Sequence, residues 1–265
     1  MKLIWTLAAW LLLGTSAHAV DTSMAERTRA CTHCHGEQGK AGPDGYYPRL
    51  AGKPAGYLFH QLQNFQQGRR HYDLMARLIE PLPDAYLRDM AQYFSSLHVP
   101  YPAPALNASG VPADVLARGK ALTLNGDASR GVPACVSCHG AQLTGVAPDV
   151  PGLLGLPLDY LNGQLGAWQS GQRRAHAPDC MAQVVKRLAS DDLMAVAQYL
   201  ARQPLPANTS PVSLGVLRAS NPASTKQQVA TDARTGAMPS RTMGATPVAT
   251  TWTCGSAPGV VGVLP

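Results

Sequence analysis

The segments Cys31-Thr32-His33-Cys34-His35 and Cys135-Val136-Ser137-Cys138-His139 decide how this chain of 265 residues folds. Both have the pattern Cys-x-x-Cys-His, which is typical of covalent attachment of a c-type haem. Two thiols three positions apart lie on the same side of a helical turn, where they can reach the two vinyl groups of one porphyrin edge. The histidine that follows can then turn its imidazole under the iron. The sequence therefore predicts two covalently bound haem c groups. Attachment is assigned to Cys31, Cys34, Cys135 and Cys138, and proximal iron ligation to His35 and His139.

Two other chemistries also use closely spaced cysteines, namely redox-active dithiols and zinc sites. A thioredoxin-like motif occurs in a βαβ pattern, which this sequence lacks. A zinc site contains no haem, and it would need four protein ligands. One accidental Cys-x-x-Cys-His match in a chain of this composition has a probability of roughly half a per cent. Two matches favour haem attachment over both alternatives.

The two halves of the chain repeat each other outside these motifs as well. Residues 48–54 match residues 151–157, and Ala91-Gln92-Tyr93 recurs as Ala197-Gln198-Tyr199. In this alignment Met75 pairs with Met181, at nearly the same distance after the two histidines. A c-type iron commonly takes Met or His as its second axial ligand. Met75 and Met181 are therefore the predicted distal ligands.

Other side chains near the iron ligands stay open as alternatives. His176, five residues before Met181, is a rival distal ligand for the second haem. The pairs Arg69-Arg70 and Arg173-Arg174 are candidates to bind haem propionates, because guanidinium pairs well with carboxylates. Solvated surface arginines explain the two pairs equally well.

The periodicity of apolar residues predicts helices and almost no strands. Apolar side chains at three- and four-residue steps indicate amphipathic helices over residues 54–67 and 157–170, each with Pro at its start. Further helices are expected over residues 84–97, 112–124 and 190–202. The predicted fold class is all-α, a tandem duplication of a haem domain with an irregular C-terminal tail.

The ends of the chain predict export and a tail. Residues 1–19 carry Lys2, an apolar run and the triplet Ala17-His18-Ala19, which is typical of a secretory signal peptide. A retained N-terminal anchor is the alternative. We expect domain 1 over residues 20–106 and domain 2 over 107–206. Residues 207–265 are rich in Ser, Thr, Pro, Ala and Gly, which predicts a low-complexity tail.

Charge and hydropathy exclude some classes of partner. The chain has 22 Lys and Arg against 16 Asp and Glu, but no basic cluster with interleaved aromatic residues. An exported protein also seldom meets nucleic acid, so a nucleic-acid partner is not expected. Outside the first twenty residues, no apolar run approaches the length of a membrane-spanning helix, which is about 18 residues.

Two cysteines lie outside the haem motifs. In an oxidising compartment a leftover pair most simply forms a disulfide, so we predict a bond between Cys180 and Cys254. Cys180 as a thiolate ligand or reactive sulfur site is the alternative.

These motifs resemble the di-haem class I cytochromes c, and most closely the cytochrome c4 family. The resemblance rests on residues 31–36, 48–70 and 75–93 and on their counterparts 135–140, 151–173 and 181–199. It implies two cytochrome c folds with their haems close together, and electron carriage out of a dehydrogenase or toward a terminal oxidase. The tail and the Cys180–Cys254 pair depart from the simplest members.

The expected function is that of a periplasmic electron carrier with two His/Met-ligated haems and no substrate pocket. The expected partners are a dehydrogenase or quinol-oxidising donor and a terminal oxidase as acceptor. Two alternatives are a di-haem enzyme with one open axial site, acting on peroxide, thiols or thiosulfate, and an electron-transfer subunit of a dehydrogenase complex. Association with a membrane complex is left open.

Overall fold

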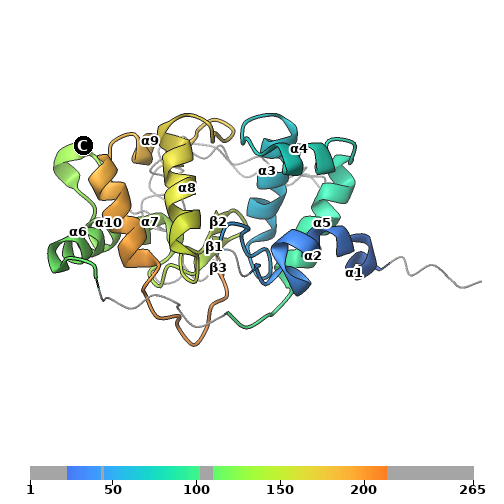
Figure 1. Ribbon diagram of the computed structural model, residues 1–265, viewed down its shortest axis with the longest axis horizontal. Coiled ribbons are helices and arrows are strands. Elements are labelled where there is room, and N and C mark those ends of the chain that lie inside the picture. The colour runs from blue at the N-terminus through green and yellow to red at the C-terminus, as the bar shows by residue number, and fades with distance from the viewer. Residues whose placement is uncertain (1–22, 43–44, 102–109, 214–265) are drawn as a thin grey trace, which may run out of the picture.

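A computed structural model of the chain describes residues 23–42, 45–101 and 110–213. The predicted signal peptide, residues 102–109 at the predicted domain boundary, and the tail from residue 214 onward with Cys254 lie outside the described residues. Within them, the elements of domain 1 and domain 2 lie on opposite sides of the molecule (Figure 1).

Both domains are built mainly from helices, in corresponding order. Domain 1 contains α1 (Met24–Arg27), α2 (Arg29–His35), the 3-10 turn η1 (Glu37–Gly39), α3 (Ala55–Gln66), α4 (Asp73–Ile79) and α5 (Asp84–Ser96). Domain 2 contains α6 (Ala113–Leu124), the 3-10 turn η2 (Ala128–Arg130), α7 (Cys135–His139), α8 (Leu158–Gln169), α9 (Cys180–Val185) and α10 (Ser190–Leu200). The five long helices that the periodicity predicts are confirmed within two residues at each end.

The starts and ends of α3 and α8 follow from their sequences. Pro54 and Pro157 stand at the N-cap positions, where the missing N–H costs no helical hydrogen bond. Gly68 and Gly171 follow the two helices with φ of 66° and 77°, which lets the chain leave in a left-handed turn. The two equivalent turns lead to Arg70 and Arg173.

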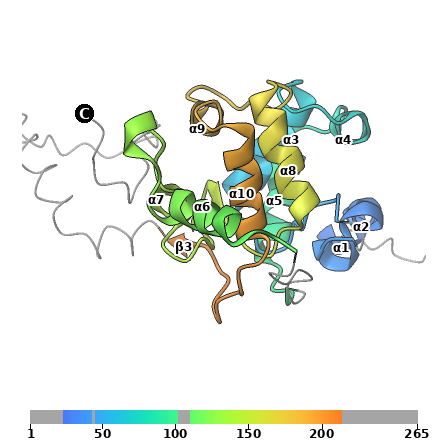
Figure 2. The ribbon, with the colours of Figure 1, turned by 60° about the vertical axis from the view of Figure 1, so that its left-hand side comes forward.

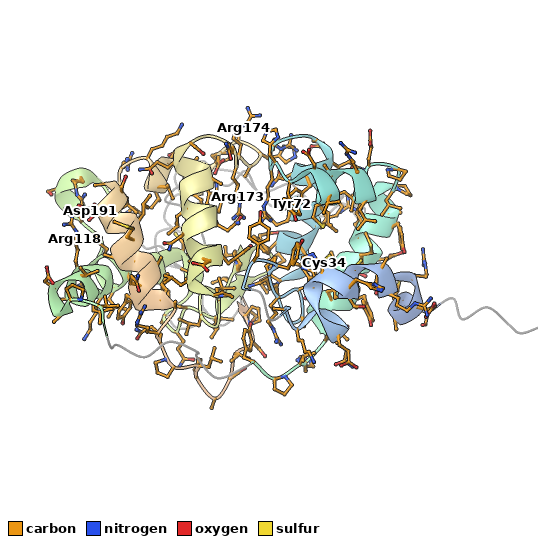
Figure 3. All side chains as sticks on the ribbon, viewed as in Figure 1. Cys34, Tyr72, Arg118, Arg173, Arg174 and Asp191 are labelled. Atoms are coloured by element: carbon orange, nitrogen blue, oxygen red, sulfur yellow. The ribbon has the colours of Figure 1, made fainter. Side chains whose placement is uncertain are left out.

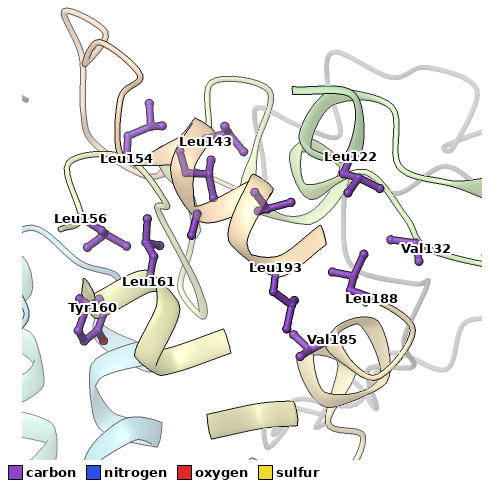
Figure 4. Close-up of a cluster of buried hydrophobic side chains, with 13 residues drawn as sticks. Leu122, Val132, Leu143, Leu154, Leu156, Tyr160, Leu161, Val185, Leu188 and Leu193 are labelled. Carbon is purple, nitrogen blue, oxygen red and sulfur yellow. The ribbon is translucent and has the colours of Figure 1, made fainter. Parts of the chain in front are cut away.

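Each domain has its own apolar core. In domain 1, α3 packs against α5 around Leu58, Phe65, Leu87 and Phe94. In domain 2, α10 packs against both α6 and α8, and α6 crosses α10 in Figure 2. The buried side chains of domain 2 converge from α6, α8, α9 and α10 (Figure 4). Gly119 permits the close crossing, because a Cβ there would lie 2.1 Å from the Ala195 carbonyl oxygen.

A small sheet in domain 2 is the main departure from the expected helices. Strands β1 (Gly145–Ala147), β2 (Val150–Pro151) and β3 (Val212–Ser213) are arranged in the order β2-β1-β3. β1 pairs antiparallel with β2 and parallel with β3. Strands of two or three residues are too short to show an alternating pattern, so periodicity could not indicate them. β3 lies within the predicted tail and pairs with β1 of domain 2.

The two predicted distal methionines lie on short helices that the periodicity of the sequence did not indicate. Met75 is in α4 and Met181 is in α9, with seven and six residues. The Asp179 side chain accepts a hydrogen bond from the Ala182 N–H and so caps α9. Helices of fewer than two turns carry too few residues for a periodic signal.

Asp192 ties three elements of domain 2 together. Its carboxylate is 0% exposed and accepts hydrogen bonds from Arg118 on α6 and Arg130 on η2. The Ala189 N–H before α10 donates to it as well, at 3.1 Å.

Among the described residues, no helix combines the length and hydropathy needed to cross a bilayer.

Candidate haem-binding sites

The two motif histidines occupy equivalent positions with the same hydrogen bond. His35 ends α2 and His139 ends α7, and both are buried. The His35 Nδ1–H donates to the Pro48 carbonyl at 2.8 Å, and the His139 Nδ1–H donates to the Pro151 carbonyl at 2.7 Å. This assignment of the proton leaves each Nε2 with a free lone pair, as an iron ligand requires.

Burial keeps both imidazoles neutral. It is the largest influence on each ring, and it lowers the pKa of His35 and of His139 despite the proline carbonyls. Nearby positive charge, from Arg70 for His35 and from Lys53 for His139, acts in the same direction. A neutral imidazole with one fixed N–H is the form that binds iron.

None of the four motif cysteines forms a disulfide, and burial keeps three of them protonated. It raises the pKa of Cys135 to about 11 and raises the pKa of Cys31 and Cys138 as well. Redox dithiols and zinc ligands react as thiolates, which a raised pKa disfavours. In the part of the chain that the structure describes, no three His, Cys, Asp or Glu side chains converge as a metal site. The geometry therefore gives no support to either alternative chemistry.

Domain 1 contains a mainly apolar cavity of about 460 Å³ at its haem motif. Cys31, Cys34, His35 and Met75 all line this cavity. Met75 also packs against the same apolar cluster as Cys31. An apolar cavity with two thiols, an imidazole and a thioether on its walls has the side chains that a haem c needs.

In domain 2 a motif cysteine and the predicted distal methionine share one apolar cluster. Met181 and Cys135 both pack against the apolar cluster of domain 2. His176 is exposed instead, and its Nε2 contacts the guanidinium of Arg69 in the other domain. Cys180 begins α9 beside Met181, and its predicted pairing with Cys254 stays a prediction, since Cys254 lies outside the described residues.

The two domains meet through a nearly symmetric polar network. Arg70 donates to Gln61 of its own domain at 3.0 Å and to Gln164 of domain 2 at 2.7 Å. Arg173 donates to Gln164 at 2.8 Å and to Gln61 at 2.9 Å. The backbones of Arg70 and Arg173 also form a bridge. Figure 3 shows Arg173 in the space between α8 and domain 1.

Two tyrosines complete this network across the domain boundary. Arg70 donates to the Tyr160 hydroxyl, and Arg173 donates to the Tyr57 hydroxyl, both at 3.3 Å. Burial alone would raise the pKa of Tyr57, but the charges of Arg173, Arg70 and Lys53 lower it to about 8. The interface therefore has a strongly positive potential.

Two buried arginines without an ion pair and one buried N–H without a hydrogen bond fit the carboxylates of haem. Arg70 and Arg173 are 9% and 4% exposed, yet neither belongs to any ion pair among the described residues. The indole N–H of Trp168, stacked under Arg173, is buried without a hydrogen-bond partner there. Buried cations and donors normally have partners, and haem propionates would supply them. Arg69 and Arg174 are more exposed, so the structure separates each predicted pair into one buried and one outer arginine.

Sequence comparison finds relatives over most of the chain. No protein-family model matches. The thiosulfate dehydrogenase electron acceptor of Thiomonas intermedia (strain K12) is 36% identical over 205 residues, covering 77% of this chain and 93% of the relative. Cytochrome c4 of Pseudomonas aeruginosa is 30% identical over 203 residues, covering 75% of this chain and 97% of the relative.

Two solved structures are similar in fold. Reduced recombinant cytochrome c4 from Pseudomonas stutzeri has a TM-score of 0.56 and 28% identity, over 67% of this chain and 95% of that one. Thiosulfate dehydrogenase from Marichromatium purpuratum, in its "as isolated" form, also has a TM-score of 0.56, with 34% identity. That match covers 66% of this chain but only 36% of the longer dehydrogenase chain.

Proposed function

The chain belongs to the cytochrome c4 family of di-haem electron-transfer cytochromes, and from this premise we propose that it carries single electrons in the periplasm from a thiosulfate-oxidising dehydrogenase to a terminal oxidase. The observation that carries the proposal is the equivalence of the two haem sites. Each has a buried imidazole whose Nδ1–H is held by a proline carbonyl, at 2.8 and 2.7 Å. Two equivalent sites beside one shared interface suit a path for electrons and not a single reactive centre.

The protein's own residues hold each iron ready for electron exchange. The haem iron supplies a one-electron ferric–ferrous couple when it is bound. His35 and His139 present Nε2 as the proximal ligand, because their Nδ1 protons are engaged. Met75 and Met181 would supply the second iron ligand, which would raise the potential and leave no site for a small ligand. With both positions filled by protein, the transfer of an electron needs little rearrangement.

The interface network supports electron transfer between the domains. Arg70 and Arg173 each donate to groups of both domains, so they hold the two haem sites at a fixed separation. Their buried positive charges also suit the propionates of two haems. Electrons would enter at one domain and leave from the other.

The names of the relatives support a thiosulfate dehydrogenase as the electron donor. A relative that matches 93% of its own length is named as the electron acceptor of such an enzyme. In the Marichromatium purpuratum dehydrogenase, a similar module occupies about a third of one longer chain. A separate carrier that docks on a dehydrogenase, or a subunit that stays bound to it, would use the same contact.

Reduction by a purified thiosulfate dehydrogenase tests the proposed function. With thiosulfate and the enzyme present under anaerobic conditions, we expect the absorption of both haems to become that of the ferrous form. Thiosulfate alone should leave them ferric. Reduction by thiosulfate without the enzyme would contradict the carrier role and indicate a catalytic haem. Co-elution of the two proteins in size-exclusion chromatography would identify a bound subunit.

A further inference from the structure

Four cationic side chains are buried where the two domains meet. Arg49, Lys53, Arg70 and Arg173 are 3%, 5%, 9% and 4% exposed. None of them belongs to an ion pair among the described residues. Four positive charges that line one cavity without an ion pair repel each other. An acidic group bound in this cavity would offset the repulsion.

Three of the four cations have hydrogen-bond acceptors, and Lys53 has none. Arg70 and Arg173 donate to glutamine and tyrosine side chains. Arg49 donates to the backbone carbonyls of Ala51, Val99 and Pro100 and stacks on the ring of Tyr101. Across the described ranges, no hydrogen bond from the Lys53 ammonium is found. Lys53 lines a cavity, so an acidic group bound in that cavity would give its ammonium the opposite charge that no described side chain supplies.

Lys53 lies at the boundary between the two domains. It directly precedes Pro54 at the start of α3, and it lines the same cavity as Cys31, Cys34 and His35. Tyr160, Gln164 and Arg173 of domain 2 line this cavity as well. One cation therefore faces a cavity to which both domains contribute.

Lys53 also breaks the symmetry of the repeat. Its counterpart in domain 2 is Leu156, which is a buried apolar residue. The pairs Arg70 with Arg173, Gln61 with Gln164 and Tyr57 with Tyr160 are matched across the interface. The shared ammonium is supplied by one domain only. A lysine with only a surface role would be exposed to solvent, whereas the Lys53 side chain is 5% exposed.

We propose that Lys53 binds haem propionate at the domain interface and is shared by both haem sites, so that its charge raises the midpoint potentials of both. The proposal rests on the proposed function as a di-haem electron carrier. Reduction adds one negative charge to each haem, and a fixed positive charge in a poorly solvated interface favours the reduced form. Lys53 thus acts as a positioning and potential-setting residue for two redox centres.

Potentiometric titration of the haem-loaded protein, followed by haem absorption, tests this role. Lys53→Gln and Lys53→Met both remove the charge. Lys53→Met keeps the volume of the side chain and replaces Lys53→Gln if that variant does not fold. We expect both midpoint potentials to fall, with the equilibrium constant for reduction of each haem decreasing about tenfold, which is about 59 mV for one electron. Lys53→Arg keeps the charge and should restore most of the shift. Lys120→Gln, which removes an exposed lysine of α6, should change neither potential.

Several results would overturn the assignment. Potentials of Lys53→Met and Lys53→Gln that equal those of Lys120→Gln would show that Lys53 does not act on the haems. A fall of one potential alone would contradict sharing between the sites. Equal falls in Lys53→Arg and Lys53→Gln would show that packing matters and not charge. Reduction of the same variants by thiosulfate dehydrogenase separates this inference from the proposed function, because unchanged potentials with normal reduction refute only the role of Lys53.

Discussion

Replacement of Met75 or Met181 by Ala is expected to open the sixth coordination position of one haem and leave the other unchanged. The altered haem should lose its weak Met-to-ferric-iron absorption band and should bind carbon monoxide when it is reduced. Its midpoint potential should also fall steeply, because Met ligation raises the potential of a c-type haem. Optical titration with carbon monoxide measures the effect, and the unaltered haem in the same molecule is an internal reference.

Two further variants make this prediction specific. Met194→Ala changes a methionine of α10 that is 52% exposed, and this variant should affect neither haem. His176→Ala changes the rival distal ligand, which is exposed and contacts Arg69. If His176→Ala opens a haem to carbon monoxide while Met181→Ala does not, the assignment of Met181 is wrong.

Asp192→Ala is expected to lower the free energy of unfolding of domain 2 by about 3 kcal/mol. The carboxylate is fully buried, and its removal leaves Arg118 and the Ala189 N–H without this acceptor. Arg130 loses one of its two carboxylate partners and keeps Asp127. Loss of one partner of a buried ion pair costs about 3–5 kcal/mol. The lower end applies because Arg118 and Arg130 are 51% and 36% exposed and can be solvated. Urea denaturation at neutral pH measures the loss.

The pH dependence of this effect identifies its electrostatic part. Burial would raise the pKa of Asp192, but hydrogen bonds from Arg130 and Arg118 lower it below its ordinary value. A depressed pKa in the folded protein means that the stabilisation is present above the unfolded pKa of about 3.9 and is lost as pH falls through the folded pKa. The difference between wild-type protein and Asp192→Ala should therefore shrink at acidic pH.

Asp191→Ala is the matched control for the buried carboxylate. Asp191 is the exposed neighbour of Asp192 in the first turn of α10, and Figure 3 shows it near Arg118 at the outer side of domain 2. Its removal should change stability by less than about 0.5 kcal/mol. Equal losses in the two variants, or a loss in Asp192→Ala that is constant down to low pH, would contradict the ion-pair explanation.

Local sequence signals were sufficient for the haem motifs and the long helices. Two copies of Cys-x-x-Cys-His carry their chemistry in five consecutive residues, and α3 and α8 show a regular apolar stripe between Pro and Gly. The elements missed were short. The strands of the small sheet and the helices α4 and α9 have too few residues for a periodic pattern.

The interface could not be derived from sequence in the same way. Tyr57 and Gln61 recur as Tyr160 and Gln164, a pattern that the repeat made visible. Their place on the predicted helices gives no sign that their polar ends bind the arginines of the opposite domain. Contacts between domains depend on tertiary structure, and no local rule places Lys53 at a cavity that both domains line.

The most direct test of the central claim is a controlled-potential titration of the wild-type, haem-loaded protein with and without carbon monoxide, followed by addition of peroxide. The account predicts that each chain takes up two electrons in one-electron steps, that carbon monoxide leaves both midpoint potentials and the ferrous spectrum unchanged, and that peroxide is not consumed. If one haem binds carbon monoxide and turns over peroxide, the protein has an open catalytic site, and the assignment as an electron carrier with two His/Met-ligated haems is contradicted.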